Sequence, residues 1–307
     1  MKSLSRFLPA CLLFLSWCAT VNAQDAARLI CCGGEEVFVI ATDTPQTSVW
    51  SWTAAQSEQI PELARGWFRT TDECKPYKDD LLLVTSSSGG VALLERSSKA
   101  CLFLTRATNA HSACLLPDNQ IVIAASYGGD QLQFFSRTEP VLQAQPDSVI
   151  PLVGAHGAVW DSRRHCLWAL GDEYILQVTW IAAEEAKDES GWRVVARHEL
   201  PSHGGHDLSR SSDDDLFVTT NSQVLLFDLR RHELAAHPEL GDRPRVKSID
   251  RDNETGEIVY HQATEEHWWS DTIQFTGTAP IQLPGKRLYK IRWDRPEPVP
   301  QIANPRD

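Results

Sequence analysis

Short apolar runs, each bounded by turn-forming residues, repeat along almost the whole chain. They are rich in Val, Ile, Leu and Phe, and they cover residues 35–42, 48–54, 80–88, 90–98, 100–108, 120–126, 131–137, 165–172, 174–181, 192–200, 215–221, 223–230, 257–263 and 271–277. Gly, Pro, Ser, Asn and Asp separate the runs at intervals typical of an all-β chain. The pattern therefore predicts β-strands throughout.

Helical periodicity is nearly absent, and residues 182–189 are the one stretch for which we expect a helical turn. No Pro-, Gly- or Ser-rich linker divides the sequence. We therefore expect residues 24–307 to form a single all-β domain.

The strands fall into groups of four when recurring openings are aligned. Units begin at "ECKPYK", "AHSACLL", "HGAVWD", "GHDLS" and "VKSID". Three N-terminal runs lack a first strand, and the C-terminal "RLYKIRWD" is a first strand without followers. Together they complete a sixth blade, which closes a ring without an open edge. The sequence thus predicts a six-bladed β-propeller of four-stranded blades, about 47 residues each, in which residues 286–294 pair with residues 28–32.

The aligned openings carry an imidazole or a lysine in every blade. Innermost propeller strands line the central channel, so these side chains should form one ring at one channel mouth. The predicted ring consists of Lys75, His111, His156, His206, Lys247 and Lys290. Any one of them could be a hydrogen-bonded lining residue. Six in register favour a binding or catalytic site, because clustered like charges destabilise a protein unless an anion compensates them.

The loops between second and third strands should surround the same mouth. They read "CCGG" (31–34), "SSSGG" (86–90), "SYGGD" (126–130), "GDEY" (171–174), "TNSQ" (220–223) and "ATEEHWWSD" (263–271). Glycine pairs allow a backbone to approach a ligand closely, aromatic rings can stack on sugars, and Asn and Asp can donate or accept hydrogen bonds. The expected substrate-binding residues are Tyr127, Tyr174, Asn221, Trp268, Trp269 and Asp271.

The N-terminus has the features of a secretory signal peptide. Lys2 and Arg6 precede an apolar run at residues 7–19, and "VNA" before Gln24 is a small-residue cleavage pattern. We therefore expect residues 1–23 to be removed and the mature protein to be secreted or periplasmic. The apolar run is too short to span a membrane.

The chain is strongly acidic. Its formal net charge is −12, and loss of Lys2 and Arg6 with the leader makes it more negative still. Such a charge disfavours nucleic acid and anionic membrane surfaces as partners. We expect a monomer without a membrane span.

Six cysteines follow the predicted leader, namely Cys31, Cys32, Cys74, Cys101, Cys114 and Cys166. They show neither a CxxC motif nor a conventional zinc spacing. In an exported protein they predict one or two structural disulfides plus buried thiols, with the pairing open.

A combination of motifs carries a resemblance to a known family. They include "CGGEEVFVI", "TSSSGGVALLER", "NAHSACLLPDNQIV", "HGAVWD", "LWALGD", "GGHDLS", "VKSI" and "RLYKIRWD". Together they resemble a family of secreted bacterial proteins of unknown function that are predicted to be six-bladed propellers. The resemblance implies the fold and an exported setting, but no reaction. The ring is also similar, at the level of fold, to propeller polysaccharide lyases, one of which holds a metal with histidines.

The predicted ring favours an enzyme that acts on an acidic glycan, foremost a uronate polysaccharide lyase. Elimination needs a neutralised carboxylate, a base for the adjacent proton and an acid for the leaving oxygen. A ring lysine or a histidine-bound metal could neutralise the carboxylate, a neutral His or Lys could act as the base, and Tyr127 or Tyr174 could act as the acid. His111, His156 and His206 would suit a divalent metal such as Mn, Zn or Ca.

Two alternatives remain open. A glycoside hydrolase would use a pair of carboxyl groups, and the candidates on this face are Asp172, Glu173, Glu265, Glu266 and Asp271. A noncatalytic glycan-binding or scaffold propeller would need only the ring and the aromatic residues. Serine chemistry is disfavoured, because there is no GxSxG motif and residues 86–88 read as a loop.

Overall fold

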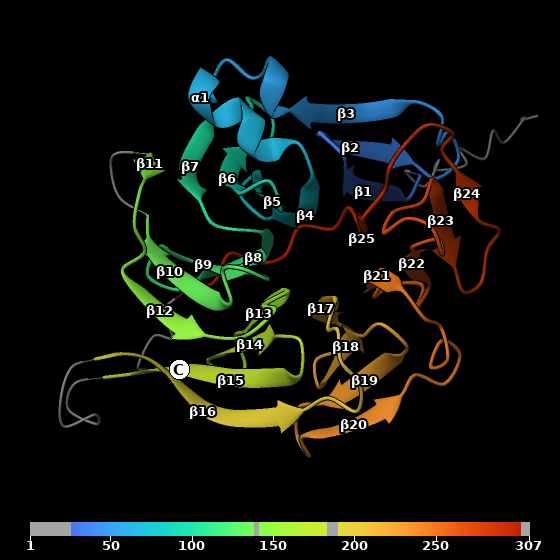
Figure 1. Ribbon diagram of the computed structural model, residues 1–307. Coiled ribbons are helices and arrows are strands. Elements are labelled where there is room, and N and C mark those ends of the chain that lie inside the picture. Colours follow the sequence, from blue (N-terminus) through green and yellow to red (C-terminus); the bar gives the residue numbers. More distant parts are fainter. Residues whose placement is uncertain (1–25, 138–140, 183–189, 302–307) are drawn as a thin grey trace, which may run out of the picture.

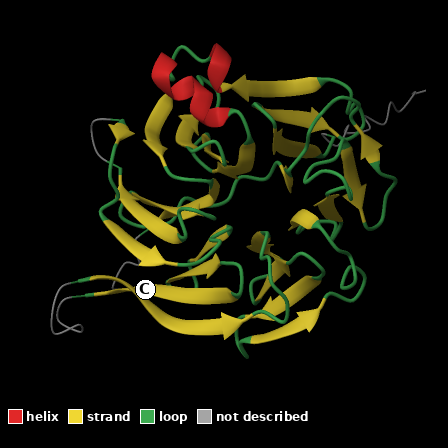
Figure 2. Cartoon of the chain, in the orientation of Figure 1, coloured by secondary structure: helices red, strands yellow, loops and turns green. Residues whose placement is uncertain are grey.

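The chain forms a six-bladed β-propeller. The computed structural model describes residues 26–137, 141–182 and 190–301. Six sheets surround a central axis, each with its inner strand nearest that axis (Figure 1). The predicted leader and the expected helical turn after Ala182 lie outside the described residues. The helical segments described are instead η1 (Ala54–Gln56), α1 (Glu62–Arg65) and η2 (Gly66–Phe68). They follow the third strand of the N-terminal sheet and lie at the outer edge of the ring (Figure 2).

The blade built from both chain ends closes the ring, as predicted. It contains β25 (Lys290–Trp293), β1 (Arg28–Gly33), β2 (Glu36–Ala41) and β3 (Ser48–Thr53), in that order. Strand β25 pairs antiparallel with β1, from Leu29 opposite Trp293 to Cys32 opposite Lys290. The C-terminal strand therefore supplies the inner strand that the N-terminal strands lack.

The other five blades follow in chain order, each antiparallel from the inner strand outward. The next two contain β4 (Thr71–Tyr77), β5 (Leu81–Ser86), β6 (Gly90–Glu95) and β7 (Cys101–Arg106), then β8 (Ala110–Leu116), β9 (Gln120–Ala125), β10 (Gln131–Ser136) and β12 (Ser148–Pro151). The short β11 (Leu142–Gln143) adds a parallel fifth strand outside β7. The segment between β10 and β12 of one blade thus pairs with the outer strand of the preceding blade, which adds a strand to the predicted four-stranded repeat.

The last three blades have four strands each. They contain β13 (Gly157–Asp161), β14 (Cys166–Leu170), β15 (Tyr174–Ile181) and β16 (Gly191–Glu199), then β17 (Asp207–Arg210), β18 (Asp215–Thr219), β19 (Val224–Asp228) and β20 (Glu233–Ala236), and finally β21 (Val246–Arg251), β22 (Ile258–Gln262), β23 (Thr272–Phe275) and β24 (Ile281–Gln282). All of them pair antiparallel.

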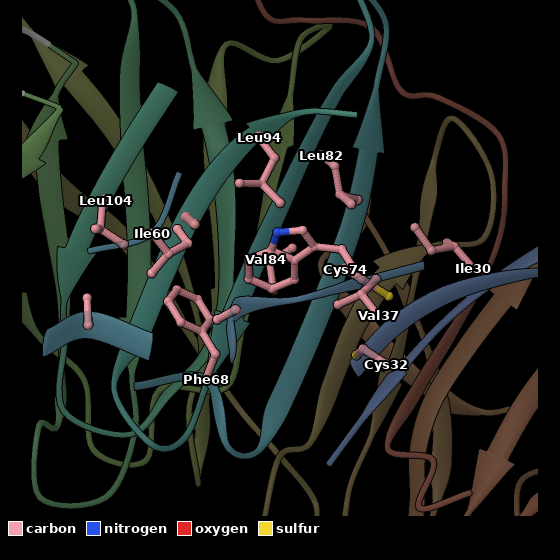
Figure 3. Packing of buried hydrophobic residues seen from close by; sticks show 14 of the residues in the cluster. Ile30, Cys32, Val37, Ile60, Phe68, Cys74, Leu82, Val84, Leu94 and Leu104 are labelled. Carbon is pink, nitrogen blue, oxygen red and sulfur yellow. The ribbon is translucent and has the colours of Figure 1, made fainter. Parts of the chain in front are cut away.

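The hydrophobic core is divided among the junctions between blades. Six clusters of buried apolar residues each combine side chains from two neighbouring sheets. At the junction of the closing blade with the next, Ile30 and Val37 pack against Leu82, Val84 and other residues (Figure 3). Burial on both faces explains why the second and third strands are continuous apolar runs. The inner strands are left to carry the polar residues of the channel.

Candidate functional site

One residue near the start of each inner strand contributes to a cluster at one mouth of the channel. Strands β4, β8 and β21 each have a β-bulge at the same position. The bulged residues are Asp72, His111 and Lys247, which therefore have no partner in the regular strand pairing. The corresponding residues of the other blades directly precede the first paired residue of the inner strand. We call the six residues the mouth ring: Asp72, His111, His156, His206, Lys247 and Tyr289.

Five members of the mouth ring form a continuous series of contacts from Asp72 to Lys247, and the Tyr289 ring lies beside His111, with centroids 5.9 Å apart. The imidazole centroids of His111 and His156 are 4.1 Å apart, and those of His156 and His206 are 5.5 Å apart. The Lys247 amine lies 2.8 Å from His206 Nε2. On the other side, Asp72 Oδ1 is 3.6 Å from His111 Nε2. The predicted convergence is therefore met by the three histidines and Lys247.

Lys75 and Lys290 do not reach this ring. Lys290 follows the ring residue Tyr289 by one position, and Lys75 follows Asp72 by three, so both lie deeper in the channel. They belong to a buried ion cluster, which we call the channel plug: Glu73, Lys75, Asp207, Lys290 and Arg292. Their predicted place in a single ring of six was wrong, because the alignment of the openings took residues one and three positions past the ring position as equivalent to the histidines.

The channel plug is closely hydrogen-bonded. Lys290 Nζ lies 3.0 Å from Asp207 Oδ1 and 3.2 Å from Glu73 Oε2, and the Arg292 guanidinium contacts both carboxylates. Burial alone would raise the pKa of Glu73, but Arg292, Lys290 and Lys75 outweigh it and hold that pKa well below its usual range. The Lys75 amine donates to Ser112 Oγ and to two backbone carbonyls. The plug cations thus have internal partners and are not free to bind a ligand.

Backbone carbonyls fix the tautomers of two ring histidines. His111 Nδ1 lies 3.1 Å from the Asn109 carbonyl oxygen, and His156 Nδ1 lies 2.8 Å from that of Gly154. A carbonyl only accepts hydrogen bonds, so each Nδ1 carries the proton and each Nε2 keeps its lone pair. Two imidazoles are thereby held in the form that can accept a proton or ligate a metal.

Burial keeps the three imidazoles uncharged at neutral pH. Burial, together with the nearby lysines, lowers the pKa of His111 to about 4 and that of His206 to about 3. The pKa of His156 is also well below its ordinary value, through burial and the adjacent imidazoles.

The two groups that flank the histidines are shifted as well. Burial lowers the pKa of Lys247 to about 8, with a further contribution from Arg245. It raises the pKa of Asp72 to about 7, although hydrogen bonds from Ser87 oppose the shift. At neutral pH the mouth ring therefore combines neutral imidazoles with one ammonium group and with a carboxyl group, that of Asp72, which titrates near neutrality.

Three of the six predicted substrate-binding residues border the mouth ring. The Tyr127 ring centroid lies 5.8 Å from that of His156, and its hydroxyl donates a 2.6 Å hydrogen bond to Asp172 Oδ1. Asn221 Oδ1 lies 2.7 Å from His206 Nε2. The Trp268 ring is 5.4 Å from that of Tyr289 and is 44 % exposed.

The other three contact different parts of the molecule. Tyr174 packs against the core between two blades beneath the Arg197 guanidinium. Trp269 stacks on His267, with ring centroids 4.7 Å apart. Asp271 accepts hydrogen bonds from Thr272 and Gln282. None of these contacts involves the mouth ring.

The predicted ring did not include Asp72 and Tyr289, because the prediction required a basic or imidazole residue at every opening. The signal that identifies Asp72 is positional. In "TDE", "AHS" and "VKS" the bulged residue stands between the first paired residue and a polar residue that faces the channel. This register becomes visible only when the second-strand partners are aligned.

The predicted metal site fits the ring only in part. His111 and His156 present free Nε2 lone pairs, as metal ligands require, whereas His206 Nε2 is occupied by Asn221 and Lys247. Lys247 would also repel a cation. Among the described residues, Asp172, Glu173 and His203 form a group whose potential ligand atoms lie within 4.8 Å of one another. A metal is therefore better accommodated beside the ring than within it.

The six cysteines of the described chain are all free thiols. The sequence predicted one or two disulfides, whereas the six described cysteines form none. Most of the thiols are kept apart because they lie in separate core clusters. Cys31, Cys114 and Cys166 each belong to a different cluster, and Cys32 and Cys74 share another.

Comparison with known proteins assigns the chain to a family but gives no activity. Across the described residues, no helix has the length and apolar character needed to cross a membrane. No curated protein matches the sequence. A family model described as "Family of unknown function (DUF6528)" matches residues 19–298, so the chain belongs to this uncharacterised family of propellers.

Proposed function

We propose that the mouth ring binds an acidic glycan and that the protein is a polysaccharide lyase acting on uronate-containing chains. The observation that supports this most is the position of Lys247, an ammonium group at neutral pH, beside three imidazoles held neutral by burial. An anionic group on the ligand complements the ammonium, and the neutral imidazoles leave a base beside it.

The residues at the mouth can be assigned to the three requirements of elimination. Lys247 binds the uronate carboxylate and stabilises the negative charge that develops on it. His156 Nε2, whose lone pair is free because Nδ1 carries the proton, accepts the proton next to the carboxylate. Tyr127 donates its hydroxyl proton to the leaving glycosidic oxygen. Burial and Asp172 raise the pKa of Tyr127, so this hydroxyl stays protonated until it donates.

The group formed by Asp172, Glu173 and His203 adds a second candidate feature. These side chains lie next to Tyr127, because Asp172 accepts a hydrogen bond from its hydroxyl group. A divalent metal held there would supply a second positive centre for an anionic glycan. The assignment of Lys247, His156 and Tyr127 does not depend on it.

The test is a screen of uronate-containing oligosaccharides against neutral oligosaccharides of the same length. Binding is measured by calorimetry, and turnover by the ultraviolet absorbance of the unsaturated product. The wild type should bind the acidic chains and form product, His156→Gln should bind without forming product, and Lys247→Ala should lose binding. Lys78→Ala is the matched control, since Lys78 is exposed beyond the far end of β4.

The outcomes separate the candidate functions. Binding without product in the wild type would favour the noncatalytic glycan-binding propeller. Loss of turnover in the presence of a chelator would indicate that a metal held by Asp172, Glu173 and His203 takes part in the reaction. Equal affinity of the wild type and Lys247→Ala for every acidic chain would contradict the proposed site.

A further inference from the structure

Arg245 stands directly before β21, and its backbone has an unusual conformation. Its φ is +59°, in the left-handed region that residues with long side chains rarely adopt. The Arg245 N–H donates to the Asn221 carbonyl at 2.9 Å, and the Arg245 carbonyl accepts from the Ala263 N–H at 3.0 Å. Both partners belong to loops beside the mouth ring. Since such a conformation persists only where its surroundings fix it, the Arg245 side chain starts from a fixed point between these two loops.

The Arg245 guanidinium is poorly paired. Its Nε is buried without a hydrogen-bond partner. Among the described residues, the one hydrogen bond that this side chain makes is long, at 3.4 Å from Nη2 to Glu265 Oε1. By contrast, the Arg96 guanidinium donates to both carboxylate oxygens of Asp294, at 2.7 and 2.6 Å. A guanidinium has five N–H donors in a fork that fits both oxygens of a carboxylate, so Arg245 keeps most of its capacity for an anion.

Arg245 lies beside the proposed glycan site but nearer to solvent. Its backbone partner Asn221 also contacts the mouth ring, because Asn221 Oδ1 lies 2.7 Å from His206 Nε2. The same imidazole nitrogen contacts the Lys247 amine. Lys247 is 8 % exposed, whereas the side chains of Arg245 and Glu265 are 39 % and 86 % exposed. A carboxylate paired with Arg245 therefore lies at the rim of the mouth, and one paired with Lys247 lies deeper.

We propose that Arg245 forms a second anion-binding subsite, which takes one carboxylate of the ligand while Lys247 takes another. This inference rests on the proposed function and specifies its substrate class. In the unliganded protein the weakly bound Glu265 carboxylate occupies the subsite, and the ligand displaces it. Two anionic groups at different depths belong to neighbouring units of a glycan. The preferred substrate is therefore a chain in which every unit is a uronate, over one in which uronates alternate with neutral sugars.

Calorimetry compares a uronate-only oligosaccharide with an alternating one of the same length. Arg245→Gln should weaken binding of the uronate-only chain by about tenfold and remove the preference for it. Arg243→Gln makes the same charge change at an exposed neighbour and should keep the affinity. Glu265→Gln should tighten binding by about threefold, because the competing carboxylate is gone, and should lose this effect in the Arg245→Gln protein. Glu266→Gln, at the next exposed position, is the matched control.

The outcomes separate the subsite from the proposed function. Equal affinity of the wild type, Arg245→Gln and Arg243→Gln for the uronate-only chain would overturn the subsite, even where Lys247→Ala loses binding as the proposed function requires. If the wild type binds no acidic chain, the proposed function fails, and inorganic sulfate tests the subsite alone. Sulfate should protect Arg245, but not Arg243, from modification by phenylglyoxal, as mapped by mass spectrometry. Equal modification of Arg245 with and without sulfate would then overturn the subsite as well.

Discussion

At the scale of single residues, His206 Nε2 has two partners with opposing requirements. It lies 2.7 Å from Asn221 Oδ1, which needs a proton on Nε2, and 2.8 Å from the Lys247 amine, whose ammonium form needs a lone pair there. One nitrogen cannot satisfy both at once. An anionic ligand that takes over Lys247 removes the conflict and leaves Nε2–H to Asn221. In the proposed function, this conflict is what an anionic ligand would relieve.

The pH dependence of binding follows from Lys247. The ammonium form that binds a carboxylate is present below the pKa of about 8 and is lost as the pH rises through it. Affinity for an oligouronate should therefore decline modestly from about pH 6 to about pH 7.5, as Asp72 with its pKa of about 7 becomes negative, and should fall by about tenfold per unit above pH 8. The histidines stay neutral over this range because their pKa values lie well below it. Calorimetry at a series of pH values measures the effect.

A conservative variant provides the control for this prediction. Lys247→Arg should keep its affinity at about pH 9, because a guanidinium does not titrate there, whereas Lys247→Ala should bind weakly at every pH. A wild type that binds equally well at about pH 7 and about pH 9 would mean that Lys247 is not the carboxylate partner.

At the scale of strands, the sequence revealed the blades but not the depth of each side chain in the channel. Strand count, turn spacing and the unmatched runs at the two chain ends were sufficient for six blades and for the pairing of β25 with β1. His111, His156, His206 and Lys247 were also found. Lys75 and Lys290 were misplaced because the repeated openings identify the blade but do not fix the register of its inner strand. Lys75 lies three residues past the bulged Asp72, and Lys290 lies one residue past Tyr289 on a strand that pairs with β1 without a bulge.

The closing strand gives a prediction at the same scale. A chain that ends at Gly285 lacks β25, so β1 has an unpaired edge next to the channel and the plug loses Lys290 and Arg292. We expect this protein to aggregate or to melt more than about 10 °C below the full chain. A chain that ends at Gln301 keeps every described strand and should melt like the full chain. Circular dichroism melts decide between these outcomes, and equal melting of all three proteins would contradict the closure.

At the scale of the whole molecule, the channel plug connects blades that share no sheet. Glu73 lies on β4, Asp207 on β17, and Lys290 and Arg292 on β25. Lys75 extends the connection, because its amine donates to the Ala158 carbonyl on β13. The plug therefore fixes opposite sides of the propeller relative to one another across the axis.

Removal of one plug carboxylate should be costly. Glu73→Gln removes a carboxylate that contacts three buried cations. Lys290 and Arg292 keep Asp207, whereas Lys75 keeps only Ser112 and two backbone carbonyls, and the free energy of unfolding should fall by about 3–5 kcal/mol. Glu36→Gln removes a more exposed carboxylate, which pairs with Lys286 at the surface, and should cost less than about 1 kcal/mol. Urea unfolding of both variants measures the difference. A similar loss in the two proteins would show that the plug is not an essential part of the fold.

The plug also determines how a long ligand can approach. Lys290, Glu73 and Asp207 are fully buried and fill the channel at the axis. A polymer therefore cannot pass through the propeller, and a ligand of the mouth ring must enter and leave by the same opening. A polysaccharide would have to lie across this face, with one internal unit dipping toward the histidines while its neighbours continue in both directions over the surrounding loops. If the proposed lyase activity is correct, this geometry favours cleavage within chains over stepwise removal of end units, and the products would leave by the same opening through which the substrate arrived.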